Sequence, residues 1–296
     1  MFSFSHLLLL LVAAIWGFAF VAQTTGMAHL GPHSFNAARF LLAAISLIPL
    51  LFIFSKGRLP HGKTFYIGGL LAGAILYCGF TFQQMGLQFT TAGNAGFITG
   101  MYIVIVPVMG IFLKHVTTIK MWAGVILAVI GLYCLSIGPD FSMGYGDFLE
   151  LVGAFFWAAH VLVIGWLSRK VDAVSLAISQ FFVASVLAII TACLLESPSM
   201  VDFQAASLSL LYAGVASSGV AFTLQIIAQK KVDPGMTALI LSTEAVFAVL
   251  GGYLLLDEVL TIKELTGCAL MLSGMIVSQW PERRLAKVKD RLITDA

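Results

Sequence analysis

Ten long apolar segments, separated by short polar gaps, take up almost the whole chain. Each is close to the roughly 20 residues that a helix rising about 1.5 Å per residue needs to cross about 30 Å of hydrocarbon. Because 60% of the residues are hydrophobic and only 10% are charged, the chain has too little polar surface for a soluble globule. The pattern predicts an all-α integral membrane protein with ten transmembrane helices. The segments lie near residues 7–27, 34–55, 64–86, 93–113, 120–138, 147–168, 174–195, 207–228, 236–256 and 262–280.

Lysine and arginine are concentrated in alternate gaps. Of the 16 such residues, only Lys263 lies in an intervening gap and only Arg39 lies inside an apolar segment. Cytoplasmic loops are enriched in these bases, so we expect both termini in the cytoplasm, a basic cytoplasmic tail at residues 282–296, and a multi-pass protein of the bacterial inner (plasma) membrane. The remaining bases are Lys56, Arg58, Lys63, Lys114, Lys120, Arg169, Lys170, Lys230, Lys231, Arg283, Arg284, Lys287, Lys289 and Arg291.

A constant shift relates the two halves of the sequence. It predicts two five-helix repeats, residues 1–140 and 141–281. Because five is odd, the second repeat enters the membrane from the opposite side. The charges agree, since the basic gap with Lys56, Arg58 and Lys63 corresponds to a stretch that carries Glu196 and Asp202. Residue pairs at the shift of 141 include Trp16 with Trp157, Arg39 with Gln180, Gly73 with Gly214 and Gln84 with Gln225.

Short motifs in both halves resemble one family. The segment Trp16-Gly17-Phe18-Ala19-Phe20 is similar to the W-G-x-x-F opening of the drug/metabolite transporter superfamily, EamA type. The run that starts at Glu244, Glu-Ala-Val-Phe-Ala, resembles the family's E-(P/A)-V-F-A signature, and the stretch from Asn94 to Gly100 resembles its fourth-helix pattern. The resemblance covers the whole chain. It implies a ten-helix transporter that exports small metabolites, often amino acids.

Several apolar segments carry one stripe of polar or aromatic residues three or four positions apart, which puts them on one helix face. Polar groups in hydrocarbon are costly without partners, so these faces should point inward, towards one another or a wet cavity. The candidates for a substrate cavity are Trp16, Phe20, Arg39, Tyr77, Gln84, Asn94, Tyr102, Trp157, His160, Gln225 and Glu244.

Arg39 and Glu244 are the charged residues placed well inside apolar segments, which makes them the leading functional candidates. Arg39 lies roughly 8 Å from the periplasmic end of its helix, so it is able to snorkel outward or to form a structural ion pair. Its planar guanidinium also suits a substrate carboxylate. These alternatives remain open from the sequence.

Glu244 lies roughly 12 Å into its helix, too deep to stay ionised alone. Structural hydrogen bonding, binding of a substrate amine and proton coupling all suit it. His160 is the one histidine inside an apolar segment and is either a packing residue or a second candidate for proton coupling. Trp16 and Trp157 are deep and equivalent, and they suit either a cavity for apolar substrates or plain helix packing.

These features favour a secondary transporter with alternating access that exports small amphipathic metabolites, amino acids above all. A channel-like facilitative permease is an alternative. An intramembrane serine protease is a remote one, suggested by Ser217-Ser218-Gly219 and His160. We expect no enzyme activity, no cofactor, no metal site and no nucleic-acid partner; the partners expected are a small molecule, protons and the lipid bilayer. Small-residue pairs such as Gly69 with Gly73 suit a monomer or a weak homodimer.

Overall fold

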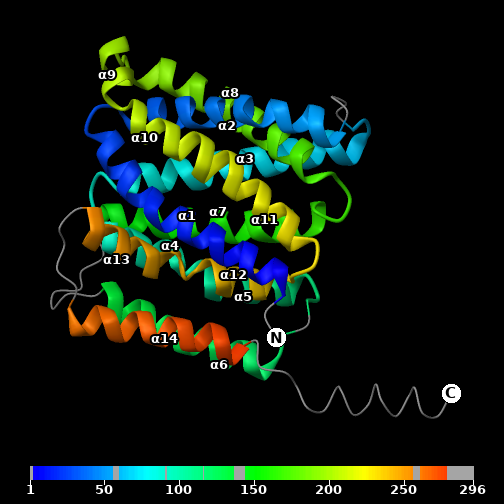
Figure 1. Cartoon of the computed structure of the whole chain (residues 1–296), viewed down its shortest axis with the longest axis vertical. Helices are drawn as coiled ribbons and strands as arrows, with labels where there is room; N and C mark the ends of the chain where they lie inside the picture. Colours follow the sequence, from blue (N-terminus) through cyan, green and yellow to red (C-terminus); the bar gives the residue numbers. More distant parts are fainter. Residues whose placement is uncertain are drawn as a thin grey trace.

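The structure is a computed structural model that describes residues 3–55, 60–90, 92–115, 117–136, 144–255 and 261–278. The described part is helical, with no strand, and it confirms the predicted all-α class (Figure 1). The basic tail predicted at residues 282–296 lies outside the described residues, as do Lys56, Arg58 and the side chain of Asn94.

The chain order of the elements follows the apolar segments of the sequence. The first half contains α1 (Phe4–Met27), α2 (Pro32–Ser55), α3 (Lys63–Gly86), α4 (Ala92–Gly100), α5 (Tyr102–Phe112) and α6 (Ile119–Ser136). The second half contains α7 (Tyr145–Leu167), α8 (Ala173–Leu195), α9 (Met200–Ala205), α10 (Ser207–Leu211), the π-helix η1 (Tyr212–Val220), α11 (Ala221–Gln229), α12 (Pro234–Leu241), α13 (Glu244–Leu255) and α14 (Ile262–Ser278).

Within the described residues, seven helical spans are long and apolar enough to cross a membrane. Two of them are composite, because α10, η1 and α11 form the span Ser207–Gln229, and α12 and α13 form the span Pro234–Leu255. Three shorter apolar helices, Ile98–Phe112, Ile119–Cys134 and Leu265–Ser278, fall in the other predicted segments. The ten crossings and the side on which the termini lie stay predictions.

Side-chain caps explain where several of these helices begin. The Asp172 carboxylate accepts hydrogen bonds from the backbone N–H groups of Ser175 (2.8 Å) and Val174 (3.3 Å), which lack helical partners at the start of α8. Asp233 caps α12 in the same way through Met236 N–H (2.9 Å), and Pro234 follows as the first helical residue. Both ends therefore follow from local sequence.

The fourth apolar segment of each half is broken. Between α12 and α13, the hydroxyls of Ser242 and Thr243 donate to the carbonyls of Leu239 (2.9 Å) and Ile240 (2.6 Å), three residues back. Such bonds compete with the regular helical pattern. Between α4 and α5, the N–H of Met101 likewise donates three residues back, to Ile98 (3.1 Å). The residues after each break point into the interior of the bundle, as described below.

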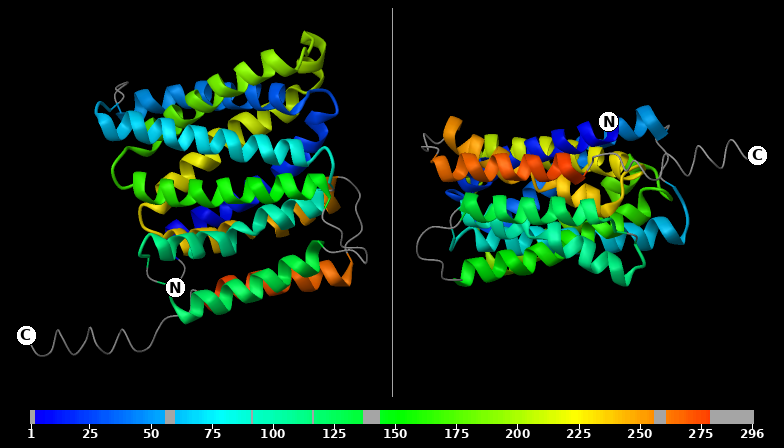
Figure 2. Two further views of the ribbon diagram at one scale, coloured as in Figure 1. Left: turned by 180° about the vertical axis from the view of Figure 1, so that it is seen from behind. Right: turned by 90° about the horizontal axis from the view of Figure 1, so that it is seen from below.

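The helices lie side by side with their axes roughly aligned, and α6 and α14 form a pair at one end of the molecule (Figure 1). Figure 2 shows the same pair from behind, with α2, α3 and α8 at the opposite end. Glycines allow α6 and α14 to touch, since a Cβ on Gly124 would lie 2.6 Å from the carbonyl oxygen of Gly274 and one on Gly131 would lie 2.6 Å from that of Gly267. Most of the other elements lie between these two ends, and α9 lies at the end that holds α2 and α8 (Figure 1).

Contacts between the halves come in equivalent pairs. Helix α1 packs against α13, and α7 packs against α4 and α5; α3 packs against α8, and η1 packs against α2. A Cβ on Gly73 would meet Val183 (2.6 Å), and one on Gly214 would meet Leu42 (2.7 Å). Both the two glycines and their two partners are 141 residues apart. Each contact from the first half to the second thus has an equivalent contact from the second half to the first. A two-fold relation between the predicted repeats requires this pattern, which supports the proposal that they are inverted copies.

Candidate functional site

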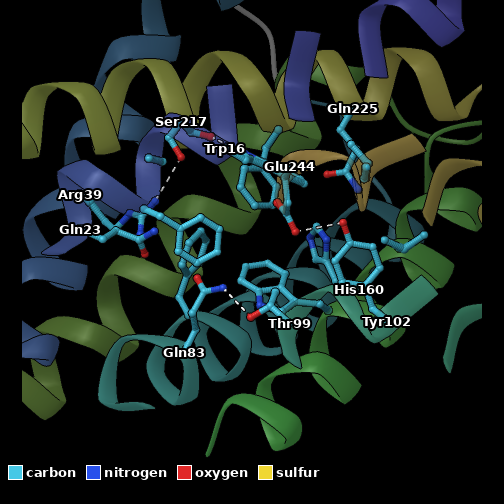
Figure 3. A pocket seen from close by; sticks show the side chains of 17 residues that line it. Trp16, Gln23, Arg39, Gln83, Thr99, Tyr102, His160, Ser217, Gln225 and Glu244 are labelled. Carbon is cyan, nitrogen blue, oxygen red and sulfur yellow. Dashed lines mark hydrogen bonds between the residues drawn. The ribbon is translucent and has the colours of Figure 1, made fainter. Parts of the chain in front are cut away.

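A cavity with about 480 Å³ of empty space, counted out to its opening, lies among side chains from both halves (Figure 3). Its wall is mostly aromatic and apolar, with a few polar groups, as in sites that bind small molecules. The lining residues come from α1, α2, α3, α4, α5, α7, η1, α11, α12 and α13. They are Trp16, Ala19, Phe20, Gln23, Arg39, Phe80, Gln83, Thr99, Tyr102, Trp157, His160, Val161, Ser217, Phe222, Gln225, Leu241 and Glu244.

Arg39 is the cation of this cavity, and its side chain is 0% exposed. Its Nη1 donates to Gln23 Oε1 at 3.0 Å, its Nε lies 3.3 Å from Ser218 Oγ, and its Nη2 lies 3.4 Å from Ser217 Oγ. The guanidinium carbon lies 4.0 Å from the centre of the Phe80 ring, a cation–π distance. The charge is thus held by neutral groups.

The burial of Arg39 overturns the snorkelling interpretation. The guanidinium contacts side chains of α1, α3 and η1, so the face of α2 that carries Arg39 looks into the bundle. Among the described residues no carboxylate is recorded in contact with the guanidinium, so the ion-pair interpretation finds no partner there. A guanidinium bound by hydroxyls, an amide and a ring retains the capacity to bind an incoming anion more strongly than these neutral partners.

Glu244 is the first residue of α13, directly after the break, and is 4% exposed. Its Oε1 accepts a hydrogen bond from the Tyr102 hydroxyl at 3.1 Å. Tyr102 is itself the first residue of α5, directly after the other break. The two broken segments therefore meet through this hydrogen bond at the cavity wall. Broken helices of this kind often form the binding sites of secondary transporters.

His160 lies beside the same wall and is almost completely buried. One ring nitrogen, Nε2, lies 3.0 Å from Gln180 Oε1, and the ring meets Phe222 edge-on at 5.6 Å. Which ring nitrogen carries the proton is set by the hydrogen-bond network. The contacts suit a bonded packing histidine, and its predicted part in proton coupling stays a prediction.

Trp16 and Trp157, which are equivalent in the two halves, make different contacts. Trp16 donates its Nε1–H to the Ser217 carbonyl at 3.0 Å and packs on Phe222 at 4.6 Å between ring centres. Trp157 meets Phe80 edge-on at 4.6 Å, and its Nε1–H is buried with no partner among the described residues. A buried donor without a partner is costly, so a ligand or water fits opposite Trp157.

Gln225 supplies an acceptor in the wall. Its amide nitrogen donates to Gln229 Oε1 at 3.0 Å, and Gln229 in turn donates to the Val161 carbonyl at 2.9 Å. This series of hydrogen bonds leaves Gln225 Oε1 buried without a partner in the described part of the protein. Among the fully buried side-chain atoms of the described cavity wall, Trp157 Nε1 and Gln225 Oε1 therefore lack a hydrogen-bond partner.

Eight of the eleven cavity candidates from the sequence line this cavity, and whether they bind substrate stays a prediction. Tyr77 does not line it, because its hydroxyl donates to Thr191 on α8 at 3.2 Å. Gln84 is fully buried but is absent from the cavity wall, and the Asn94 side chain lies outside the described residues. The eight are Trp16, Phe20, Arg39, Tyr102, Trp157, His160, Gln225 and Glu244.

Sequence reasoning missed several wall residues. Gln23 shares a helix face with Trp16 and Phe20, so helical spacing was a usable signal for it. Ser217 had no such signal, because its direction depends on η1, a nine-residue stretch of π-helix in which the residues per turn differ. Thr99 and Gln83 are joined by a 3.2 Å hydrogen bond that crosses between α4 and α3 and has no counterpart in sequence spacing.

A second cavity opens at the far ends of α5, α7 and α12, with about 1,660 Å³ of empty space including its mouth. Its rim contains four residues of the predicted cytoplasmic loops: Lys114, His115, Arg169 and Lys170. Val161 lines the first cavity and its neighbour Leu162 lines the second. Neighbouring residues of α7 therefore line the two cavities.

Comparisons with known proteins agree over nearly the whole chain. The model of the EamA-like transporter family matches residues 3–137 and again residues 144–279. An uncharacterized transporter of Archaeoglobus fulgidus is 34% identical over 279 residues, which cover 93% of this chain and 85% of that protein. A probable amino-acid metabolite efflux pump of Escherichia coli is 24% identical over 299 residues, covering 95% and 97%. A solved crystal structure, 18% identical, shares the fold with a TM-score of 0.80 and covers 96% of this chain and 99% of that one.

Proposed function

Since the chain belongs to the EamA-like transporter family, we propose that it is a secondary transporter that exports small amphipathic metabolites, amino acids above all. The chain is a transporter and not an enzyme, as the family and the relatives' names indicate. The observation that carries the substrate proposal is the cavity itself, which holds one cation, one carboxyl group and an aromatic wall. The efflux pump named among the relatives supports the same class of substrate.

In this proposal Arg39 binds the substrate carboxylate. Its present partners, Gln23, Ser217 and Ser218, are neutral, and a carboxylate forms shorter and stronger charge-assisted bonds with a guanidinium. The exchange requires only side-chain movement. The unused Nε1–H of Trp157 supplies a further donor in the same cavity.

Glu244 binds the substrate ammonium group in one step of the cycle and a proton in another. The Tyr102 hydroxyl, 3.1 Å away, satisfies one carboxyl oxygen in either case. Substrate and proton then compete for one site, and this competition is sufficient to couple export of the substrate to import of a proton. The apolar side chain of the substrate packs against Phe80, Trp157 and Phe222.

Alternating access follows from the repeat architecture in the same proposal. The larger cavity, with its rim of Lys114, Arg169 and Lys170, is the approach from the cytoplasm. In this state Val161 and Leu162 of α7 separate it from the substrate site. Rocking of one repeat against the other opens the site to the opposite side. We place the protein in the bacterial inner membrane with both termini in the cytoplasm.

The test is efflux from proteoliposomes loaded with single radiolabelled L-amino acids, with and without a lower external pH. We expect saturable efflux that the proton gradient accelerates, and much slower efflux of the matching D-amino acids. Flux that rises linearly with concentration and ignores stereochemistry would indicate a channel-like permease instead. Absence of flux for all twenty L-amino acids would overturn the substrate class.

A further inference from the structure

Glu150 on α7 is a further deeply buried ionisable group, and the proposed transport cycle leaves it without a role. Its side chain is 0% exposed, and it lies against α3, where a Cβ on Gly86 would fall 2.7 Å from Glu150 Oε1. The Thr99 hydroxyl on α4 donates to Glu150 Oε2 at 3.0 Å. The other oxygen, Oε1, has no hydrogen-bond partner among the described residues.

The described surroundings of Glu150 supply no positive charge. Helix α3 places Gly86 against it, and α4 supplies the hydroxyl of Thr99. The charged neighbour is Asp147, one turn earlier on α7, which is another acid. No basic side chain is recorded in contact with Glu150 in the described ranges. An ionised carboxylate in a dry interior is strongly unfavourable without a cation, so Glu150 holds a bound proton or a bound cation in this state.

Asp147 differs from Glu150 because its carboxylate is satisfied. Thr90 donates to Oδ1 at 2.5 Å, and the backbone N–H of Gly144 donates to Oδ2 at 2.9 Å. These contacts anchor Asp147 at the end of α7 and fix the N-terminal turn of the helix. The unpartnered oxygen therefore belongs to Glu150 alone of this acidic pair.

The Glu150 carboxyl is connected to the central cavity by one hydroxyl. Thr99 lines the cavity, and besides donating to Glu150 it accepts a hydrogen bond from Gln83, another lining residue, at 3.2 Å. A ligand that accepts a hydrogen bond from Thr99 or Gln83 therefore alters the hydrogen bond that Thr99 donates to Glu150. The described residues contain no group of three or more metal-ligating side chains, which favours a proton over a metal ion.

We propose that Glu150 is a second proton-binding site of this transporter, which holds an exchangeable proton on Oε1 and is linked to the cavity through Thr99 and Gln83. This inference rests on the proposed transport function for its role in the cycle. The proton binds to Oε1, the oxygen that has no partner, and Thr99 keeps its hydrogen bond to Oε2. On release the proton goes to water that is admitted when the repeats move.

The test is infrared difference spectroscopy of the protein in lipid bilayers, cycled between acidic and alkaline buffer, with the proton as the only ligand. A protonated carboxyl group gives a C=O stretching band that the ionised form lacks. We expect Glu150→Gln to remove one component of the wild-type band and Glu244→Gln to remove another. The control Glu196→Gln alters a carboxylate that receives two backbone N–H bonds outside the cavity, and it should keep both components.

An unchanged band in Glu150→Gln would overturn the proposal. If that variant does not fold, Thr99→Val keeps the carboxyl and removes its hydrogen bond, so the Glu150 component should move to higher frequency; no movement would also overturn it. If the pH at which the Glu150 band appears differs between sodium chloride and choline chloride, the site would be assigned to sodium instead. Because no amino acid is present, failure of the flux assay and failure of this assay are distinguishable.

Discussion

The two halves of the molecule share a frame but differ in the polar groups that they hold inside it. Gly73 and Gly214 face equivalent partners across the interface between the halves. At the equivalent positions 39 and 180, however, the first half has an arginine and the second a glutamine. Glu244 is the first residue after the break in the second half, and the same place in the first half is taken by Tyr102.

This difference separates two kinds of constraint. Packing between equivalent helices tolerates only small residues, so both copies keep glycine where backbones touch. The cavity has a different constraint, because a two-fold arrangement would place identical charges close together in a dry interior. The first half instead supplies the cation Arg39, and the second supplies Glu244 and His160. The asymmetry matches a substrate with two unlike ends.

The largest expected effect comes from giving position 39 the residue of its counterpart. Arg39→Gln removes the cavity's cation and its charge-assisted hydrogen bonds, so we expect amino-acid efflux from proteoliposomes to fall about 100-fold, equivalent to about 2.7 kcal/mol. The matched variant Gln180→Leu removes one neutral hydrogen bond to His160 and should lower efflux by about fivefold or less. Equal losses in the two folded variants would contradict the assignment of Arg39.

The glycine pair tests the shared frame. A Cβ on Gly73 would lie 2.6 Å from the Gln180 carbonyl oxygen, and one on Gly214 would lie 2.7 Å from Leu42 Cβ. We expect Gly73→Ala and Gly214→Ala each to lower the free energy of unfolding by about 1–3 kcal/mol, measured by denaturation in detergent. Gly96→Ala is the control, because a Cβ there meets nothing within 4 Å. A stable Gly73→Ala with an unstable Gly214→Ala would break the two-fold relation.

The smallest effect concerns how equivalent helices begin. Helix α2 receives its cap from the other half, since the Glu196 carboxylate accepts from the backbone N–H groups of His33 (2.9 Å) and Ser34 (2.8 Å), whereas α8 is capped by its own Asp172. Glu196→Gln should lower the free energy of unfolding by about 1 kcal/mol.

High salt should reduce the difference between wild type and Glu196→Gln, because the carboxylate is only partly buried and screening weakens its interaction with the helix end. The control Asp172→Asn keeps a capping side chain and should change stability by a few tenths of a kcal/mol. A Glu196→Gln protein as stable as wild type would mean that the cap from Glu196 does not stabilise the start of α2.

The sequence predicted much of the candidate site where helical spacing decides direction. Trp16 and Phe20 are four residues apart on α1, and both line the cavity. Arg39 was correctly singled out as a charge inside an apolar segment, but snorkelling was wrong, because the guanidinium is fully buried against α1, α3 and η1. Tyr77 has similar spacing on α3, yet it faces Thr191 on α8. Spacing gives a shared face and does not say which neighbour that face meets.

The sequence by itself determined the all-helical class, the apolar spans and the shift that relates the halves, because these depend on composition and on periodicity along one chain. Only the tertiary structure decided which polar atoms have partners. Trp157 Nε1 and Gln225 Oε1 remain unpartnered in the cavity wall of the described protein, and Glu150 lies one hydroxyl behind it. These facts depend on side chains from helices far apart in sequence and on two local irregularities, the π-helix and the broken segments. Hydrogen bonding and burial are properties of the packed interior, so no spacing rule along the chain contains them.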